Sequence, residues 1–152
     1  YYEVSKLKEP IVLELGVHEG FGSTVALLAG VNKATGHLYS VDVAECQGAI
    51  KLYENEPNWT FTQSESVAFA KQWDKPIDFL FIDTIHIYGQ VMQELVNLMP
   101  WVKKGGIIAL HDTISHPKEI LSAAYDFLSR YPSEYRFHNF EHSAGLGVIT
   151  KL

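Results

Sequence analysis

Four ionisable side chains that could do chemistry fall in two short segments, FIDTIHIY (81–88) and GGIIALHDT (105–113). The first contains Asp83 and His86, and the second contains His111 and Asp112. Carboxylate oxygens suit a hard ion such as Mg²⁺, whereas imidazoles suit a softer metal or proton transfer. If the two segments end neighbouring strands, the four groups form a metal site or an acid/base set. Alternatively, Asp112 caps the next turn and either histidine is an ordinary buried residue.

A second candidate site is the stretch IVLELGVHEGFGS (11–23), which runs from apolar residues into a glycine-rich turn. A dinucleotide fingerprint requires glycine at the first, third and sixth positions of such a turn. Counted from Gly16, the third and sixth positions are His18 and Phe21, so that pattern fails. The Gly-Lys-Ser/Thr ending of a P-loop is also missing.

What remains is the pattern E-x-G-x-x-x-G, made by Glu14, Gly16 and Gly20. It suits a ligand that needs close approach of the backbone but brings no pyrophosphate, although three glycines in a tight turn would look the same. Ser23 is expected to cap the helix that follows. We expect Glu14 to support the glycine loop or to approach the ligand.

Polar residues at two further strand ends fit the same pocket. Asp42 ends the run 37–43 and is placed to accept hydrogen bonds from ribose hydroxyls, unless it is a solvated turn residue. Ser64 and Glu65 follow the run 59–64, where an adenine edge could be contacted. Glu65 could equally be a first-turn acid that stabilises a helix dipole.

The elements that must position these residues alternate between apolar runs and helical patterns. Strands are expected at 11–16, 37–43, 59–64, 77–83 and 107–113, and a final antiparallel hairpin at 135–140 and 145–152. Helices are expected from Ser23 to a stop at Gly30, then at 46–56, 65–73 and 118–131. This order predicts a doubly wound α/β fold with a mostly parallel sheet and helices on both faces.

Two further details concern helix faces and turns. One helix is expected to carry Val91, Leu95, Leu98 and Val102 on a single face, with a turn at 105–106 after it. In the last helix, Pro117 is expected in the first turn, with an inner face of Ile120, Ala124, Phe127 and Tyr131.

Bulk properties limit the class of protein. The chain of 152 residues is expected to be one domain, 1–152. Its net charge of −6 argues against binding to nucleic acid or to an anionic membrane. Cys46 is the only cysteine, and no apolar run approaches the roughly 18 residues of a membrane span, so a cytoplasmic location is expected. A first residue other than Met is consistent with a trimmed fragment, and a homo-oligomer stays open.

Taken together, the chain resembles a class I S-adenosylmethionine-dependent methyltransferase over nearly its whole length. VLELGVHEGFGST resembles the first motif of that family, SVDV its acidic second-strand motif, and KKGGIIALHDT its fifth-strand segment. FIDTIHIY together with HDT resembles the branch of macrolide sugar O-methyltransferases and cephalosporin hydroxylase relatives.

The resemblance implies a seven-stranded, Rossmann-like sheet whose antiparallel last strand is inserted between its neighbours. It implies S-adenosylmethionine over Gly16 to Gly20, its ribose on Asp42 and its methyl group toward Asp83. The expected cofactor residues are Glu14, Gly16, Gly20, Ser23, Asp42, Ser64, Glu65 and Asp83.

In that branch a divalent metal is held by acids after the fourth and fifth strands. Asp83 and Asp112 match those positions. Together with His111 they are the expected metal residues, and Mg²⁺ is a second expected cofactor. His111 stands where an acid is usual, and Ile85 replaces the second acid of a frequent D-G-D-H motif.

The sequence thus predicts O-methylation of a small hydroxylated acceptor by Asp83, His86 and His111. One histidine would act as base, and Asp83 would orient substrate or metal. An alternative is a non-catalytic S-adenosylmethionine-binding or scaffold domain that lacks its own substrate cover. A nicotinamide oxidoreductase is disfavoured by His18 and Phe21.

Overall fold

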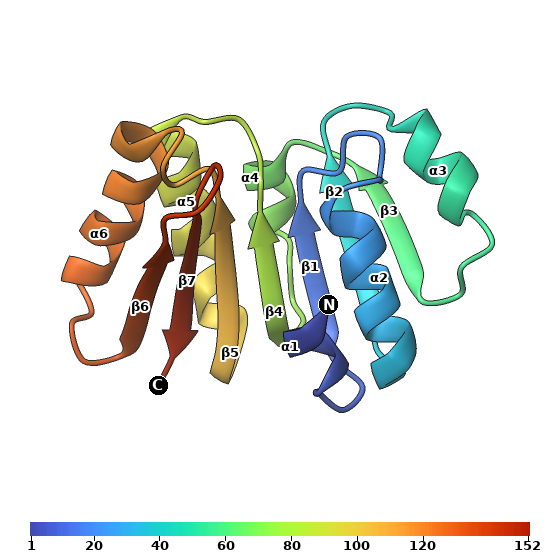
Figure 1. Cartoon of the computed structure of the whole chain (residues 1–152), viewed down its shortest axis with the longest axis horizontal. Coiled ribbons are helices and arrows are strands. Elements are labelled where there is room, and N and C mark those ends of the chain that lie inside the picture. Colours follow the sequence, from blue (N-terminus) through green and yellow to red (C-terminus); the bar gives the residue numbers. More distant parts are fainter.

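The chain forms a seven-stranded sheet with helices on both faces (Figure 1), described for residues 1–152 by a computed structural model. The strand order is β3-β2-β1-β4-β5-β7-β6. The strands are β1 (Ile11–Leu15), β2 (His37–Asp42), β3 (Trp59–Gln63), β4 (Ile77–Ile82), β5 (Val102–His111), β6 (Tyr135–Phe140) and β7 (Leu146–Lys151). Strands β1 to β5 pair in parallel, whereas β7 is antiparallel to both β5 and β6. The predicted fold and the inserted antiparallel strand are confirmed.

Six α-helices, of which α1 precedes the first strand, accompany the strands, together with two short helical turns. The helices are α1 (Tyr2–Ser5), α2 (Ser23–Ala34), α3 (Gln47–Tyr53), α4 (Ser66–Ala70), α5 (Tyr88–Leu98) and α6 (Ser122–Ser129). The turns are a 3-10 turn at Met99–Trp101 and a π turn at Pro117–Leu121. In Figure 1, α1 and α2 lie over one face of the sheet, and α4 and α5 lie over the other. None of these helices has the length and apolar character needed to span a bilayer.

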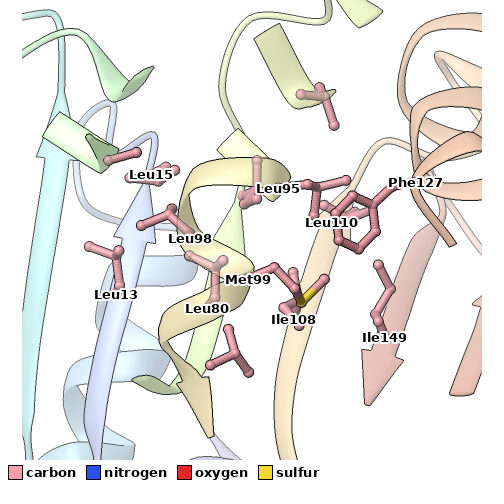
Figure 2. Close-up of a cluster of buried hydrophobic side chains, with 14 of the residues drawn as sticks. Leu13, Leu15, Leu80, Leu95, Leu98, Met99, Ile108, Leu110, Phe127 and Ile149 are labelled. Carbon is pink, nitrogen blue, oxygen red and sulfur yellow. The ribbon is translucent and has the colours of Figure 1, made fainter. Parts of the chain in front are cut away.

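The core explains why the sheet is rigid at its centre. On β1, Val12 packs toward α2, whereas Leu13 and Leu15 pack into the larger cluster under α5 and α6. Figure 2 shows that cluster, in which Phe127 of α6 meets side chains of β5 and β7. A fully buried leucine of this kind contributes roughly 1.5–3 kcal/mol to folding. Because β1 is buried on both faces and β4 is buried on one face and half-buried on the other, these strands hold their carboxyl ends in place.

The sheet has its topological switch point between β1 and β4. The chain proceeds from β1 outward to β2 and β3, and then returns to place β4 on the other side of β1. Ligands of open α/β sheets bind at the carboxyl ends of the strands at such a point. Here the glycine loop after β1 faces the segment after β4, where the Asp83 N–H donates to the Leu15 carbonyl at 2.8 Å.

The start and end of α2 differ from the prediction. Gly30 does not stop the helix, which continues to Ala34 and ends at Thr35 with a left-handed φ of 55°. A Cβ on Gly30 would lie 2.9 Å from Cβ of Val4, so this glycine allows α1 to pack closely on α2. Ser23 is the first helical residue rather than the cap, which is Gly22, and its hydroxyl bonds to Glu14 instead.

Val102 belongs to a strand rather than to the preceding helix. Helix α5 ends at Leu98, the 3-10 turn containing Pro100 follows, and Val102 opens β5. The glycines at 105 and 106 lie inside β5, where its pairing with β4 shifts register between Ile77 and Phe79. The predicted turn is therefore an irregularity within a longer strand. Ile77 pairs with Val102 and Phe79 with Ile107, so β5 has more residues than β4 between these two pairs and cannot pair regularly there.

The last helix is partly as predicted. Pro117 opens the helical segment, but its first turn is π-helical and α6 itself ends at Ser129. Ile120, Ala124 and Phe127 are buried as expected, whereas Tyr131 lies beyond the helix and is 39% exposed. Helices α3 and α4 are shorter than predicted because the chain turns away after Tyr53 and after Ala70. The hairpin through residues 141–145 is confirmed.

Candidate active site

A cavity of about 690 Å³ lies at the carboxyl ends of β1 to β4. Its walls are the glycine loop, the residues that follow β2, β3 and β4, and Gln90 of α5. Seven of the predicted cofactor residues line it, namely Gly16, Gly20, Ser23, Asp42, Ser64, Glu65 and Asp83. Glu14 is the predicted cofactor residue that does not. The ends of the first four predicted strands therefore converge on one cavity, whereas His111 and Asp112 after the fifth do not line it.

The glycine loop is fixed by close backbone contact. Gly16 has φ of +94°, and a Cβ there would lie 2.0 Å from the carbonyl oxygen of Asp83. Only glycine allows both this conformation and the contact between the ends of β1 and β4. The Tyr53 hydroxyl donates to the Gly20 carbonyl at 2.7 Å, which ties the loop to α3.

Asp42 holds the glycine loop against β2. Its Oδ2 accepts the N–H groups of Val17 at 2.8 Å and His18 at 3.1 Å, and its Oδ1 accepts that of Ala44 at 2.9 Å. Burial by itself would raise the pKa of Asp42, but these backbone hydrogen bonds and the Cys46 thiol lower it overall. Because the chain already supplies several donors, a ribose hydroxyl would share this carboxylate with the loop.

The surroundings of Cys46 disfavour a nucleophilic role for its thiol. Burial, followed by the charge of Asp42, raises the pKa of the Cys46 thiol to about 12. A thiol that stays protonated at neutral pH has little reactivity. Its role is to pack with Val17 and Ala49 under the loop.

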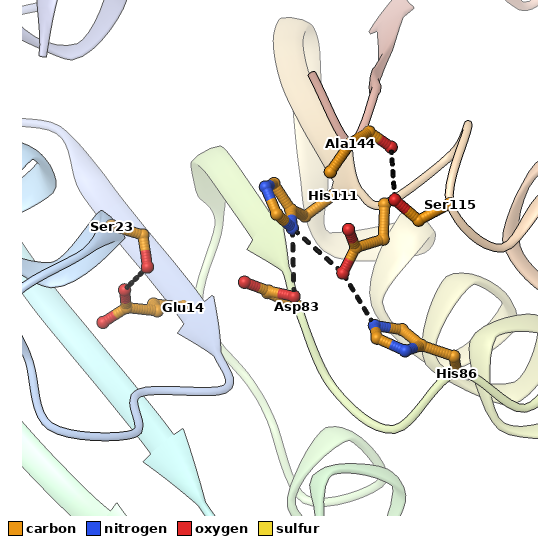
Figure 3. A network of polar contacts seen from close by, with 8 residues as sticks. Glu14, Ser23, Asp83, His86, His111, Ser115 and Ala144 are labelled. Atoms are coloured by element: carbon orange, nitrogen blue, oxygen red, sulfur yellow. Dashed lines mark hydrogen bonds and ion pairs between the residues drawn. The ribbon is translucent and has the colours of Figure 1, made fainter.

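Glu14 supports the loop from beneath the cavity. The carboxylate is fully buried and accepts the hydroxyls of Ser23 at 2.6 Å, Thr24 at 3.0 Å and Ser40 at 2.7 Å. Figure 3 shows the contact with Ser23. Burial raises the pKa of Glu14, and the three hydroxyls oppose that change. Of the two roles expected for Glu14, the contacts are those of loop support.

A second buried carboxylate, Glu94 of α5, was missed in the sequence. It accepts the hydroxyls of Ser66 and Thr84, the latter at 2.9 Å, and the amide of Gln90 at 3.2 Å. Burial raises the pKa of Glu94, and its hydrogen bonds oppose that change. Its three partners all line the cavity. The available signal was a charged residue beside Val91 and Leu95 on the inward face of the helix.

The four predicted ionisable residues do come together, next to the cavity and on the far side of Asp83 from the glycine loop (Figure 3). His86 Nε2 lies 2.9 Å from Oδ2 of Asp112. His111 Nδ1 lies 3.2 Å from the same oxygen and 3.4 Å from Oδ1 of Asp83. Burial raises the pKa of Asp83; His111 opposes this, and the charge of Asp112 adds to it.

The two imidazoles have no ordinary hydrogen bonds at these atoms. His86 Nε2 and His111 Nδ1 are both shielded from solvent, and neither meets hydrogen-bond geometry despite the short contacts. The His86 ring also stacks on His116 at 3.9 Å between centroids and 24° between planes. Nothing in the sequence pattern pointed to His116, because its place depends on the turn after β5.

That turn is clamped by the β6–β7 hairpin. Asp112 has a left-handed φ of 59°, and its carbonyl accepts the His116 N–H at 2.8 Å. The Ala144 carbonyl accepts the N–H groups of Ile114 at 2.9 Å and Ser115 at 3.1 Å. The hairpin at the end of the chain therefore sets the positions of Asp112 and His116.

Donors of this kind can hold a divalent ion. Asp83, His86 and Asp112 each offer one ligand atom, and these atoms all lie within 4.8 Å of one another. His111 was predicted as the third ligand, whereas the compact group contains His86. The chemistry of the donors and the two imidazole nitrogens without hydrogen bonds fit a metal.

Comparison with known proteins identifies the family. Residues 13–113, about two thirds of the chain, match a family model described as a methyltransferase domain. The chain belongs to this methyltransferase family. The matched segment contains the glycine loop, Asp42, Asp83 and the His111–Asp112 pair, so every site residue predicted from the sequence lies within it.

Solved structures of methyltransferases share the fold. A protein from Clostridium thermocellum assigned as an rRNA methylase is 16% identical with a TM-score of 0.77, and the match covers 99% of this chain and 94% of that one. A protein from Staphylococcus aureus assigned as a caffeoyl-CoA O-methyltransferase is 17% identical with a TM-score of 0.77, covering 99% and 78%.

A third similar structure is MycE methyltransferase of the mycinamycin biosynthetic pathway, in complex with Mg and SAH. It is 19% identical with a TM-score of 0.66, and the match covers 94% of this chain and 45% of the MycE chain. At these identities the three structures establish the fold. The resemblance to S-adenosylmethionine-dependent methyltransferases is confirmed by the family match.

Proposed function

We propose that this methyltransferase transfers the methyl group of S-adenosylmethionine to a hydroxyl oxygen of a small acceptor. The bond between the sulfonium sulfur and the methyl carbon breaks, the bond from that carbon to the acceptor oxygen forms, and S-adenosylhomocysteine leaves. The observation that carries the proposal is the position of Asp83. It lines the glycine-loop cavity and also contacts the cluster of His111 and Asp112.

The cavity supplies the parts that the methyl donor requires. The backbone of Gly16 to Gly20 would lie against the donor's methionine part, and Asp42 against its ribose. Ser64 and Glu65 follow β3, where they would flank the adenine. Since the sulfonium is already activated, the remaining task of the protein is to hold the acceptor in line with the methyl group.

The cluster supplies the groups that act on the acceptor. A hydroxyl is a weak nucleophile until its proton is removed, and an imidazole is the usual proton acceptor near neutral pH. His111 lies beside Asp83 and is 39% exposed at its side chain, so an acceptor can reach it. Asp83 would orient the acceptor. A divalent ion held by the carboxylates of Asp83 and Asp112 would lower the pKa of the acceptor hydroxyl.

A small acceptor fits the charge and surface better than RNA does. The net charge of −6 disfavours a polyanion. Two apolar side chains next to the cluster in the chain, Ile85 and Ile114, are 58% and 39% exposed. An acceptor with an apolar part would cover them.

The test is a transfer assay with a panel of phenols, catechols, sugars and polyketides, measured by release of S-adenosylhomocysteine. We expect at least one hydroxylated acceptor to be methylated. The double variant Asp83→Ala/His111→Ala should abolish turnover and change cofactor affinity by less than about threefold. His138→Ala, on the exposed face of β6, is the control. Cofactor binding without transfer to any acceptor would contradict the proposal and favour a non-catalytic binding domain.

A further inference from the structure

The cluster beyond Asp83 contains more nitrogen than a magnesium site requires. We propose that Asp83, His86 and Asp112 bind a first-row transition-metal ion in preference to Mg²⁺, and that His111 remains outside this ligand set. The inference deepens the proposed function, because it rests on the same cluster and assigns different roles to its two central histidines.

The spacing of the three ligand atoms suits one small ion. Metal–nitrogen and metal–oxygen distances near 2.1 Å place neighbouring ligands about 3.0–3.4 Å apart in octahedral or tetrahedral shells. His86 Nε2 and Asp112 Oδ2 are 2.9 Å apart, and all three atoms lie within 4.8 Å of one another. Side-chain adjustments alone would therefore close the site around an ion.

The close approach of His86 and Asp112 is better explained by two ligands of one metal ion than by a hydrogen bond. Nε2 of His86 is shielded from solvent and has no hydrogen-bond partner, although a carboxylate oxygen lies within reach. A buried polar atom without a partner is costly and calls for an explanation. A shared ion supplies one, because ligands of one metal approach closely without exchanging a proton.

His86 is better held for this role than His111. Its ring stacks on His116, and the His116 N–H is bonded to the carbonyl of Asp112. One turn therefore supplies a ligand and also supports the ring of the second ligand. His111 packs more distantly, with its ring 6.2 Å from that of Phe81, and its side chain is more exposed, 39% against 29%.

The donor set decides the class of metal. Mg²⁺ prefers oxygen ligands in near-ideal octahedral geometry. An imidazole ligand favours first-row transition metals, and the affinity of such a site generally rises from Mn²⁺ toward the later members of the series. The two carboxylates balance the charge of a divalent ion. Partial exposure of the donors, 33% for the Asp83 side chain and 17% for that of Asp112, leaves room for an acceptor at the ion.

The experiment measures Co²⁺, Mn²⁺ and Mg²⁺ binding to the whole chain by calorimetry, with Co²⁺ also followed by its visible absorption. We expect Co²⁺ to bind at least 100-fold more tightly than Mg²⁺. His86→Ala should weaken Co²⁺ binding at least 30-fold, whereas the matched variant His111→Ala should change the Co²⁺ affinity by less than threefold. Pulsed electron paramagnetic resonance of bound Mn²⁺ should show an imidazole nitrogen in the wild type and in His111→Ala but not in His86→Ala.

Three results would overturn the inference. These are no binding of Co²⁺, equal binding of Mg²⁺ and Co²⁺, or a nitrogen signal that disappears with His111 rather than with His86. Circular dichroism and S-adenosylhomocysteine affinity show whether each variant is folded. Tight Co²⁺ binding without methyl transfer would refute the proposed function alone. Methyl transfer by a protein that fails the metal tests would refute this inference alone.

Discussion

Replacing Glu14 tests whether hydrogen-bond acceptance beneath the glycine loop holds the site together. The carboxylate accepts three hydroxyls, of which Thr24 and Ser40 are fully buried and Ser23 is half-buried. Glu14→Ala would leave the two buried hydroxyls without their acceptor, at about 1–3 kcal/mol each. The void left by the lost side chain adds to this cost.

The expected loss in unfolding free energy for Glu14→Ala is therefore about 3–5 kcal/mol, a large share of the ~5–15 kcal/mol of a typical domain. For a chain of this length it corresponds to a fall in Tm of roughly 6–20 °C. Glu14→Gln keeps one acceptor oxygen and removes a buried charge, so its loss should stay below about 1.5 kcal/mol. S-adenosylhomocysteine affinity should fall with Glu14→Ala, because Ser23 and the loop lose their support.

The assay is urea unfolding at pH 7, followed by far-UV circular dichroism, with calorimetry for the ligand. Glu141→Ala in the exposed hairpin loop is the control for loss of a carboxylate. Two outcomes would refute the reasoning. Glu14→Ala could lie within 1 kcal/mol of the wild type, or Glu14→Gln could be as harmful as Glu14→Ala, which would make the charge rather than the hydrogen bonds decisive.

Three further predictions concern the cavity and its second carboxylate. Gly16→Ala should weaken cofactor binding at least tenfold in calorimetry, because its Cβ would meet the Asp83 carbonyl at 2.0 Å; unchanged affinity would contradict the close contact. Asp42→Asn should also weaken cofactor binding, by the roughly 1.5–3 kcal/mol of a hydrogen bond to a charged group. If the ribose contact is the cause, the substitution should weaken binding of a deoxyribose analogue less. Burial raises the pKa of Glu94 above 4.5, so its stabilising contribution is fully present below pH 4.5 and is lost as pH rises through the folded-state pKa. Urea unfolding from pH 4 to 8 should accordingly show the wild type losing stability relative to Glu94→Gln as pH rises, and parallel curves would refute this.

The sequence by itself determined the sheet and most of the cavity wall. Apolar runs that end in Asp42 and Asp83 predicted two of the strands, and parallel strands must present their carboxyl ends at one edge. His18 and Phe21 stand where a dinucleotide fingerprint requires glycine, so the sequence also argued against a dinucleotide as the ligand. These features are local, since each depends on the residue types within one strand and its turn.

Tertiary structure decided which polar groups line the cavity and which support the fold. Glu14 became a support because α2 brings the hydroxyls of Ser23 and Thr24 to it. Glu94 became one because α5 carries it to the hydroxyls of Ser66 and Thr84. Gly30 lies inside α2 rather than at its end, and its lack of a side chain leaves room for α1 to pack on the helix. No spacing rule could place His116 against His86, because that contact depends on a left-handed turn at Asp112 and on the distant Ala144 carbonyl. The residue types indicated which chemistry was possible, because side-chain chemistry is local. Contacts between distant parts of the chain determined which candidate residues line the cavity, because these contacts fix their positions.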